Sequence, residues 1–184
     1  VRIADYDIHT PGDAPDVLVA MNPAALKKEL EDLKPNGVII VNTDEFNARN
    51  LAKAGYAANP LEDGSLGDFR LYRIDISELT AHALKDAGLS KKDVGRCKNY
   101  YALGLMLSLY SRPLDREEED IRSKFAKKPQ IAEANVLALR AGYAYADATR
   151  GGRRLSPHAT RRTLTVRVDA YADADAGAYE AKAD

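Results

Sequence analysis

Two short runs of mostly apolar residues near the start of the chain predict strands that are buried on both faces. The first run occupies residues 16–21 and the second occupies residues 37–42. Continuous apolar runs of this length are typical of central strands in parallel sheets, because helices cover both faces of such sheets. After each run the apolar residues recur at helical spacing, over residues 23–33 and again over residues 43–54. Two strand–helix units in succession predict a mainly parallel sheet.

Turn and capping residues indicate where these elements begin and end. Asn22 suits a helix N-cap, and Pro23 suits the first helical position, where a missing N–H leaves no bond unmade. The Pro-Asn-Gly sequence at 35–37 predicts the turn that ends this helix. Thr43 and the residue after it can cap the second helix, which Gly55 closes.

The second half of the chain is predicted to be helical after one more strand. Residues 57–68 are typical of a polar surface loop, and the alternation over 69–76 predicts a half-exposed strand at the edge of the sheet. The later periodicity predicts helices over residues 77–87, 90–111, 117–128 and 130–146. The pattern therefore predicts an α/β domain over residues 1–150, with helices packed on the faces of the sheet and a helical C-terminal part.

Residues 151–184 differ in composition from the rest of the chain. Six arginines and no acidic residue occur from Arg150 to Arg167, and five acidic residues lie among alanines from Asp169 to Asp184. Residues 163–168 alternate like a short strand, but an isolated strand would be unstable. We therefore expect an Arg-rich, then Ala/Asp-rich, disordered tail. The arginines lack interleaved aromatic residues and adjoin an acidic stretch, so we do not expect nucleic-acid binding.

The overall composition excludes several classes of function. The net charge of −1 gives no global field that would attract nucleic acid or an anionic membrane. No apolar run approaches the roughly 20 residues needed to cross a bilayer. Cys97 is the only cysteine, so one copy of the chain cannot form a disulfide, a four-thiolate zinc site or an iron–sulfur cluster. We expect a cytoplasmic protein without a membrane partner.

No group of residues in the sequence forms a recognisable catalytic or metal site. His9, His82 and His158 are scattered, and none has a second ligand at helical spacing. Cys97 lies on the apolar stripe of its predicted helix, where a buried thiol acts as a small hydrophobic group. Neither a phosphate-binding P-loop nor a dinucleotide-binding glycine motif is present. We therefore assign no catalytic residue to this chain.

The best candidate surface lies where the two buried strands end. Parallel sheets bind ligands at the carboxyl ends of their strands, and Asn22, Asn42 and Thr43 occupy these ends beside helix N-termini. The alternative, weighed equally, is that the two asparagines only cap helices, and both roles can hold together. Lys98 and Asn99 are further candidates for polar contacts, because they begin an otherwise apolar helix segment. The alternative interpretation is that these two residues lie on a helix surface that faces solvent.

Several stretches of the chain, in their order and spacing, resemble one family. The chain is similar to the γ-type domain found at the start of the α subunit in 2-oxoacid:ferredoxin oxidoreductases, and the resemblance is strongest to the bacterial 2-oxoglutarate:ferredoxin enzymes. It extends over roughly residues 1–147, and it implies a three-layer α/β/α unit. The stretches that carry it are residues 16–26, 37–46, 50–56, 59–61, 98–104 and 124–129.

The resemblance implies an activity that this chain would share only as part of a complex. Enzymes of this family oxidatively decarboxylate a 2-oxoacid with coenzyme A, giving an acyl-CoA and passing electrons to ferredoxin. Thiamine diphosphate, iron–sulfur clusters and coenzyme A are therefore expected on partner domains, and no cofactor is expected on this chain alone. The implied partners are the thiamine-diphosphate-binding α and β parts, with ferredoxin reached indirectly.

The sequence also departs from the family in two places, which leaves other hypotheses open. The family domain begins with a strand and a glycine-rich turn that do not appear here, and the chain continues into the tail at 151–184 instead of a pyrimidine-binding domain. We therefore expect a shortened product that is inactive alone and marginally stable. The alternatives are a non-catalytic module for assembly or for binding a small ligand, and a truncated remnant without function.

Overall fold

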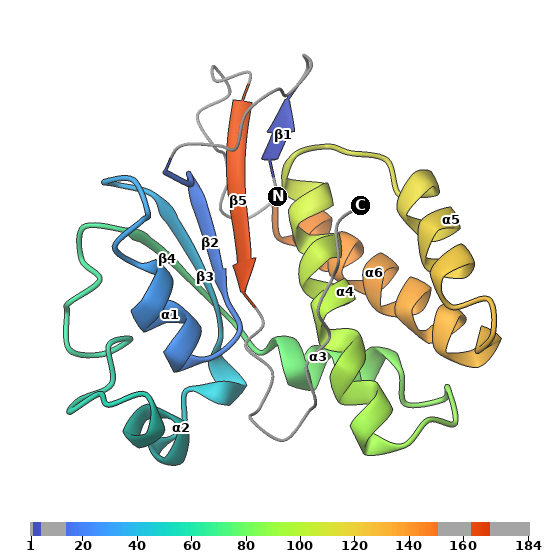
Figure 1. The fold of residues 1–184 in the computed structure, drawn as a ribbon, viewed down its shortest axis with the longest axis horizontal. Helices are drawn as coiled ribbons and strands as arrows, with labels where there is room; N and C mark the ends of the chain where they lie inside the picture. Colours follow the sequence, from blue (N-terminus) through green and yellow to red (C-terminus); the bar gives the residue numbers. More distant parts are fainter. Residues whose placement is uncertain (1, 5–13, 151–162, 170–184) are drawn as a thin grey trace.

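The computed structural model describes residues 2–4, 14–150 and 163–169. Its centre is a five-stranded sheet in the order β1-β5-β2-β3-β4 (Figure 1). The strands are β1 (Arg2–Ala4), β2 (Val17–Ala20), β3 (Val38–Asn42), β4 (Arg70–Ile74) and β5 (Thr163–Asp169). The helices are α1 (Pro23–Glu29), the 3-10 helix η1 (Thr43–Glu45), α2 (Ala48–Lys53), α3 (Ile76–Ala83), α4 (Lys91–Leu109), α5 (Asp115–Lys124) and α6 (Pro129–Arg150).

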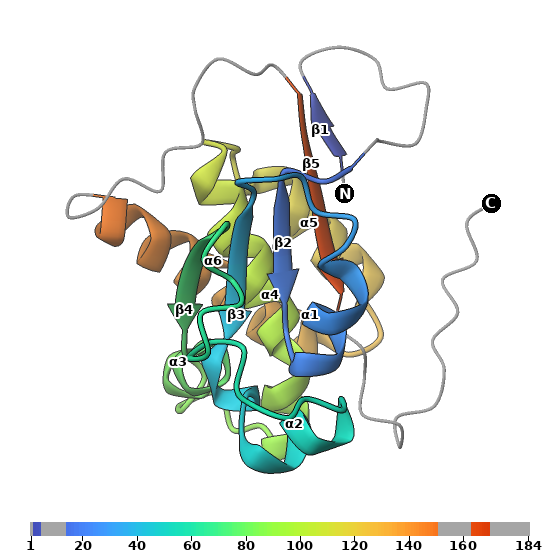
Figure 2. The same ribbon diagram turned by 90° about the vertical axis from the view of Figure 1, so that its left-hand side faces the viewer.

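The sheet is mainly parallel and lies between two layers of helices. Strands β2, β3 and β4 pair in parallel, β5 pairs in parallel with β2, and β1 is antiparallel to β5. Helices α1 and α2 lie on one side of the sheet, whereas α4, α5 and α6 lie on the other (Figures 1 and 2). The α/β class and the three-layer arrangement predicted from the sequence are therefore confirmed.

The two buried strands divide their side chains between two apolar clusters, one on each face of the sheet. Val17 and Val19 of β2 pack with α4 residues such as Leu105, whereas Leu18 and Ala20 lie in the other cluster. That second cluster contains Leu26 of α1 together with residues from the loops, namely Leu33, Phe46, Leu61 and Leu66. Because helices or loops cover both faces, apolar side chains are buried on either side of these strands, which explains their nearly continuous apolar runs.

Helices α4 and α6 cross at a point where their backbones touch. A Cβ atom at Gly104 would overlap the carbonyl oxygen of Leu139, and one at Gly142 would overlap the carbonyl oxygen of Tyr101. Only glycine fits at both positions, because any side chain would force the helices apart. The close crossing holds the two longest helices of the fold together against the sheet.

The segment after β3 differs from the single helix predicted over residues 43–54. It forms η1 and then α2, and Phe46 between them is buried in the apolar cluster around α1. The Asn47 side chain accepts a hydrogen bond from the backbone N–H of Asn50 at 3.0 Å and so caps α2. Thr43 therefore does not cap this helix, because turning Phe46 into the core interrupts the helical path.

Part of the tail at residues 151–184, which we predicted to be disordered, forms strand β5. Strand β5 lies between β1 and β2 in the sheet, with Val166 in register with Val17 and Leu164 in register with Ile3. The sequence argument treated this segment as an isolated strand, whereas here it has a neighbour on each side. Residues 151–162 and 170–184 lie outside the described residues, so the prediction for them stays untested.

Candidate functional site

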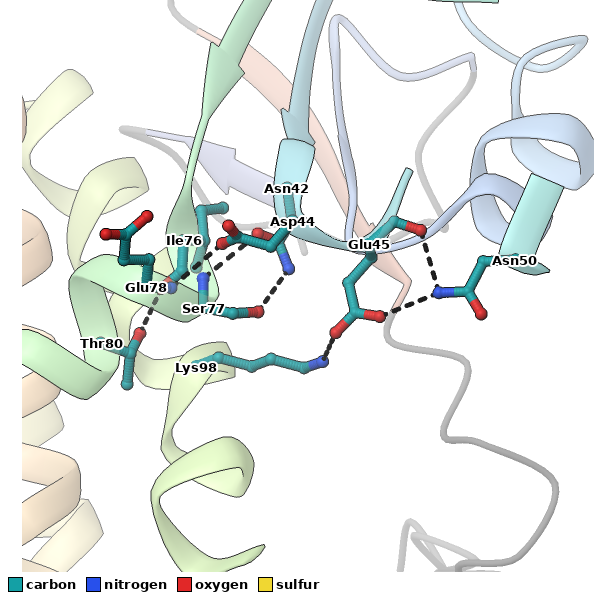
Figure 3. Close-up of polar contacts among 9 residues, drawn as sticks. All are labelled: Asn42, Asp44, Glu45, Asn50, Ile76, Ser77, Glu78, Thr80 and Lys98. Atoms are coloured by element: carbon teal, nitrogen blue, oxygen red, sulfur yellow. Dashed lines mark hydrogen bonds and ion pairs between the residues drawn. The ribbon is translucent and has the colours of Figure 1, made fainter. Parts of the chain in front are cut away.

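Asn42, at the carboxyl end of β3, is fully buried and joins this strand to the start of α3. Its Oδ1 atom accepts a hydrogen bond from the backbone N–H of Ser77 at 3.2 Å, and its Nδ2 atom donates to Ser77 Oγ at 2.9 Å (Figure 3). Both polar atoms of the amide thus have a partner, as a buried amide requires. Asn42 caps a helix 35 positions further along the chain, and not the helical segment that directly follows it.

Asp44 adds a second bond to the same helix end. Its Oδ2 atom accepts a hydrogen bond from the backbone N–H of Glu78 at 3.0 Å (Figure 3). Asp75, which precedes α3, makes no capping bond with its own side chain and instead accepts a hydrogen bond from Thr43 Oγ1. Two first-turn N–H groups of α3 are therefore satisfied from the segment after β3, and the Asp44 carboxylate lies at the positive end of the helix dipole.

Lys98 of α4 connects to the same segment through an ion pair. Its Nζ atom lies 2.9 Å from Glu45 Oε1, and both side chains are about three-quarters buried. The other carboxylate oxygen of Glu45 accepts a hydrogen bond from Asn50 Nδ2 at 3.1 Å, and so does its backbone carbonyl at 3.0 Å (Figure 3). This network links α4, the end of β3 and α2.

The sequence-predicted site residues are only partly brought together. Asn42, Thr43 and Lys98 contribute to one junction at the carboxyl end of the sheet. Asn22 caps α1 by accepting a hydrogen bond from the backbone N–H of Ala25 at 2.9 Å, as its position before Pro23 predicts. Asn99 is exposed on α4.

The junction also contains residues that the sequence analysis did not select. Glu45, Asn50 and Ser77 are separated from their partners by turns or whole elements, so no local spacing indicates them. One signal was present for Ser77, because it follows the end of the predicted edge strand. Carboxyl ends of neighbouring parallel strands meet at one edge of the sheet, which places Ser77 near Asn42.

The chemistry available at this junction is structural. The amide, carboxylate and ammonium groups described above bond to one another and to helix N–H groups, and together they hold α2, α3 and α4 at the end of β3. Within the described ranges, no three His, Cys, Asp or Glu side chains gather in a way that could hold a metal ion. His82 is exposed on α3, while His9 and His158 lie outside those ranges.

Cys97, next to Lys98 in the sequence, is buried in the apolar cluster that contains Leu105. Its Sγ atom donates to the backbone carbonyl of Asp93 at 3.3 Å. Burial, with a smaller contribution from the Asp93 charge, raises the pKa of this thiol to about 11. The thiol is therefore protonated at neutral pH, and the prediction that it acts as a small hydrophobic group is confirmed. No helix in the described part of the chain is long and apolar enough to span a membrane.

Comparisons with known proteins identify relatives over most of the chain. Residues 1–145 match the family model described as pyruvate ferredoxin/flavodoxin oxidoreductase. The chain is 56% identical over 149 residues to the 2-oxoglutarate oxidoreductase subunit KorA of Mycobacterium tuberculosis. The matched residues make up 81% of this chain and 23% of that relative. It is 26% identical over 144 residues to the indolepyruvate oxidoreductase subunit IorB of Archaeoglobus fulgidus, covering 78% of this chain and 69% of that relative.

A solved structure is similar over the same extent. The 2-oxoglutarate:ferredoxin oxidoreductase from Magnetococcus marinus, with 2-oxoglutarate, coenzyme A and succinyl-CoA bound, superposes with a TM-score of 0.57 and 25% sequence identity. The match covers 83% of this chain and 23% of that one. The chain thus spans 23% of the length of both 2-oxoglutarate proteins.

Proposed function

The chain belongs to the pyruvate ferredoxin/flavodoxin oxidoreductase family, and from that premise we propose that it forms the γ-type domain of a 2-oxoacid:ferredoxin oxidoreductase. The observation that carries this proposal is the 56% identity over 149 residues to a 2-oxoglutarate oxidoreductase subunit. We propose 2-oxoglutarate as the substrate of the complete enzyme for the same reason. The reaction would be oxidative decarboxylation to the acyl-CoA, with electrons passed to ferredoxin.

The catalytic cofactors are proposed to lie on partner parts of the enzyme. Thiamine diphosphate does not fit at the N-terminus of α3, because Asn42 and Asp44 already bond to the N–H groups there. The carboxylates of Asp44 and Asp75 would also repel a diphosphate there. The single cysteine cannot supply the thiolates of an iron–sulfur cluster. We therefore assign no chemical step to this chain, and we propose that partner parts bind these cofactors and coenzyme A.

The candidate residues then divide between internal support and contact with partners. Asn22 and Asn42 have helix-capping roles, and Thr43 bonds to Asp75, so we propose that these three support the fold. Lys98 and Asn99 remain our candidates for contacts with the thiamine-diphosphate-binding α and β parts. Asn99 is exposed and adjoins the ion pair that fixes Lys98. The cytoplasmic location and the indirect contact with ferredoxin stay predictions.

Co-purification tests this proposal directly. The full chain is tagged in its native cell, and the recovered material is examined for partner chains, thiamine diphosphate, iron, and reduction of a viologen dye with 2-oxoglutarate and coenzyme A. We expect partner chains in fixed ratio and activity only in the assembled material. The same tag on an unrelated domain of similar size is the control. Recovery of the folded chain alone, or dye reduction by the chain without partners, would contradict the proposal.

A further inference from the structure

Six exposed lysines gather where the loop between α3 and α4 meets the loop between α5 and α6. Gln130 Nε2 donates a hydrogen bond to the backbone carbonyl of Ala87 at 3.2 Å, which brings the two loops together. The rings of Tyr100 and Phe125, with centroids 6.2 Å apart, hold the end of α5 against α4. We call this surface the basic corner, and it consists of Lys85, Lys91, Lys92, Lys124, Lys127 and Lys128.

The described residues around the basic corner do not balance its charge. None of its six ammonium groups forms an ion pair with a described residue. Asp93, which follows Lys92, pairs with Arg96 instead. Asp86 is the only acidic residue of the loops at 84–90 and 125–128. A strong positive excess therefore remains at this surface.

Four of the lysines lie where helices usually carry acidic residues. Lys91 and Lys92 begin α4. Lys127 and Lys128 directly precede α6, whose first turn contains no acidic residue. The N-terminal end of a helix has a positive partial charge, so lysines there are unfavourable unless an anion lies near them. Departures from local preference of this kind are typical of functional positions.

Residues 170–184 of the same chain have the complementary charge. They contain Asp173, Asp175, Glu180, Asp184 and a single lysine. β5 is parallel to β2 and ends at Asp169, so the chain leaves the sheet at its carboxyl end. Figure 1 shows that α4 begins at this end of the molecule. Fifteen extended residues span about 50 Å, whereas the radius of gyration of a domain of this size is about 15 Å, so the segment can reach the basic corner.

Carboxylates fit the basic corner better than nucleic acid does. Its cations are all lysines, which lack the planar fork with which arginine binds phosphate. Phe125, the one aromatic residue of the two loops, packs against Tyr100 and so is not free to stack on a base.

We propose that residues 170–184 dock on the basic corner of the same chain through their carboxylates. The docked segment shields the lysines and competes with any other acidic partner for them. This contact lies within one chain, so it goes beyond the proposed function and does not depend on partner subunits.

A zero-length cross-link tests this contact in the full chain. A carbodiimide activates a carboxylate, and a lysine amine in direct contact with it then forms an amide. We expect cross-links from residues 170–184 to the basic corner, at least about fivefold more abundant than to Lys53, an exposed lysine on α2. Salt at about 1 M should reduce them by a similar factor, because the Debye length falls to about 3 Å.

Three results would overturn the proposal. The first is an equal yield of cross-links at Lys53 and at the basic corner. The second is cross-linking mainly between an isotope-labelled and an unlabelled chain in a mixture, which would make a second copy the partner. The third is a basic corner occupied by a different protein, or by nucleic acid detected in the ultraviolet absorbance of the purified chain.

Neutralising the carboxylates gives an independent measurement. In the variant Asp173→Asn with Asp175→Asn, a water-soluble active ester should acylate the lysines of the basic corner at least about threefold faster, because a docked segment shields them in proportion to its occupancy. The control, Glu31→Gln with Glu62→Gln, removes the same charge from exposed positions elsewhere and should leave the rates unchanged. Equal rates in both variants and the unaltered chain would overturn the proposal. Both measurements use the purified chain, so their outcome is separate from whether partner subunits co-purify.

Discussion

Lys98 and Glu45 lie 53 positions apart in the sequence, yet their side chains form an ion pair at 2.9 Å. The pair crosses from α4, on one side of the sheet, to the segment that follows β3. Asn50 bonds to the same carboxylate and extends the connection to α2. The end of the sheet is thus held by side chains from both layers of helices, and this arrangement can be tested residue by residue.

Breaking this ion pair should have a measurable but modest effect. We expect Lys98→Met to lower the free energy of unfolding by about 0.5 to 1 kcal/mol, because the pair is only partly shielded from solvent. Lys91→Met, at an exposed position of the same helix, is the matched control and should change it less. A urea titration measures both, and added salt should shrink their difference. Equal losses in the two variants would show that the pair does not stabilise the fold.

Removing the buried amide at the end of β3 should cost more. Asn42→Ala deletes the cap of α3 and leaves the N–H of Ser77 without its acceptor. We expect a loss of about 1 to 3 kcal/mol in the free energy of unfolding. Asn99→Ala removes the same amide from an exposed position and should stay within about 0.5 kcal/mol of the unaltered chain. Thermal and urea unfolding measure both variants. If Asn42→Ala, like Asn99→Ala, lowers the free energy of unfolding by less than about 0.5 kcal/mol, as surface substitutions usually do, the prediction is wrong.

The helix crossing gives a sharper contrast between two glycines of α4. Gly104→Ala places a methyl group against the Leu139 carbonyl, so we expect a loss of about 3 kcal/mol or more in the free energy of unfolding. Gly95 has open space around it, and Gly95→Ala should stabilise the chain by about 0.5 to 1 kcal/mol. Unfolding midpoints should therefore move in opposite directions. Movement in the same direction would mean that the crossing tolerates a side chain.

Cys97 predicts a specific dependence on alkaline pH. Its thiol has a pKa of about 11 in the folded chain, raised from 9.0, so between these values the folded state binds more protons than the unfolded state. Its contribution to stability is therefore complete below pH 9 and is lost as the pH rises towards 11. Urea unfolding at a series of pH values should show this decline. Cys97→Ala should flatten the decline, and an identical profile in both chains would refute the assignment.

The proposed contact surface can be tested at the exposed residue beside the ion pair. If partner subunits cover this part of α4, Asn99→Arg should reduce the recovery of partner chains on co-purification at least about tenfold, because a buried unpaired charge is costly. Glu119→Arg, exposed on α5, is the control for a surface charge change. Circular dichroism should show that both variants fold. Full recovery with Asn99→Arg would place the interface elsewhere.

Local patterns in the sequence predicted the features that depend on neighbouring residues. The apolar runs gave β2 and β3, and the cap at Asn22 followed from the proline after it. Features that depend on distant partners were not visible in the same way. Asn42 bonds to Ser77 across a strand and a loop, and β5 pairs with two strands from the start of the chain. Tertiary contacts of this kind have no periodic signature.

The helix prediction over residues 43–54 failed for a related reason. Helical spacing was present, but burying Phe46 beside α1 ends η1 early, and Asn47 then starts a new helix. The interaction that decided this boundary lies between elements, whereas capping preferences describe one element at a time. The glycines at the α4–α6 crossing were missed similarly, because only the opposite helix explains them.

The position of β5 has a consequence for how the protein is made. Ribosomes release β2 and β3 long before the segment that pairs with the outer edge of β2 has been synthesised. At about 5 to 20 residues per second, the nascent chain carries that open edge for many seconds. Pairing over such a separation is also slow to form, because the intervening chain must first be ordered. Until β5 has been synthesised, the outer edge of β2 is therefore open to wrong strand pairing.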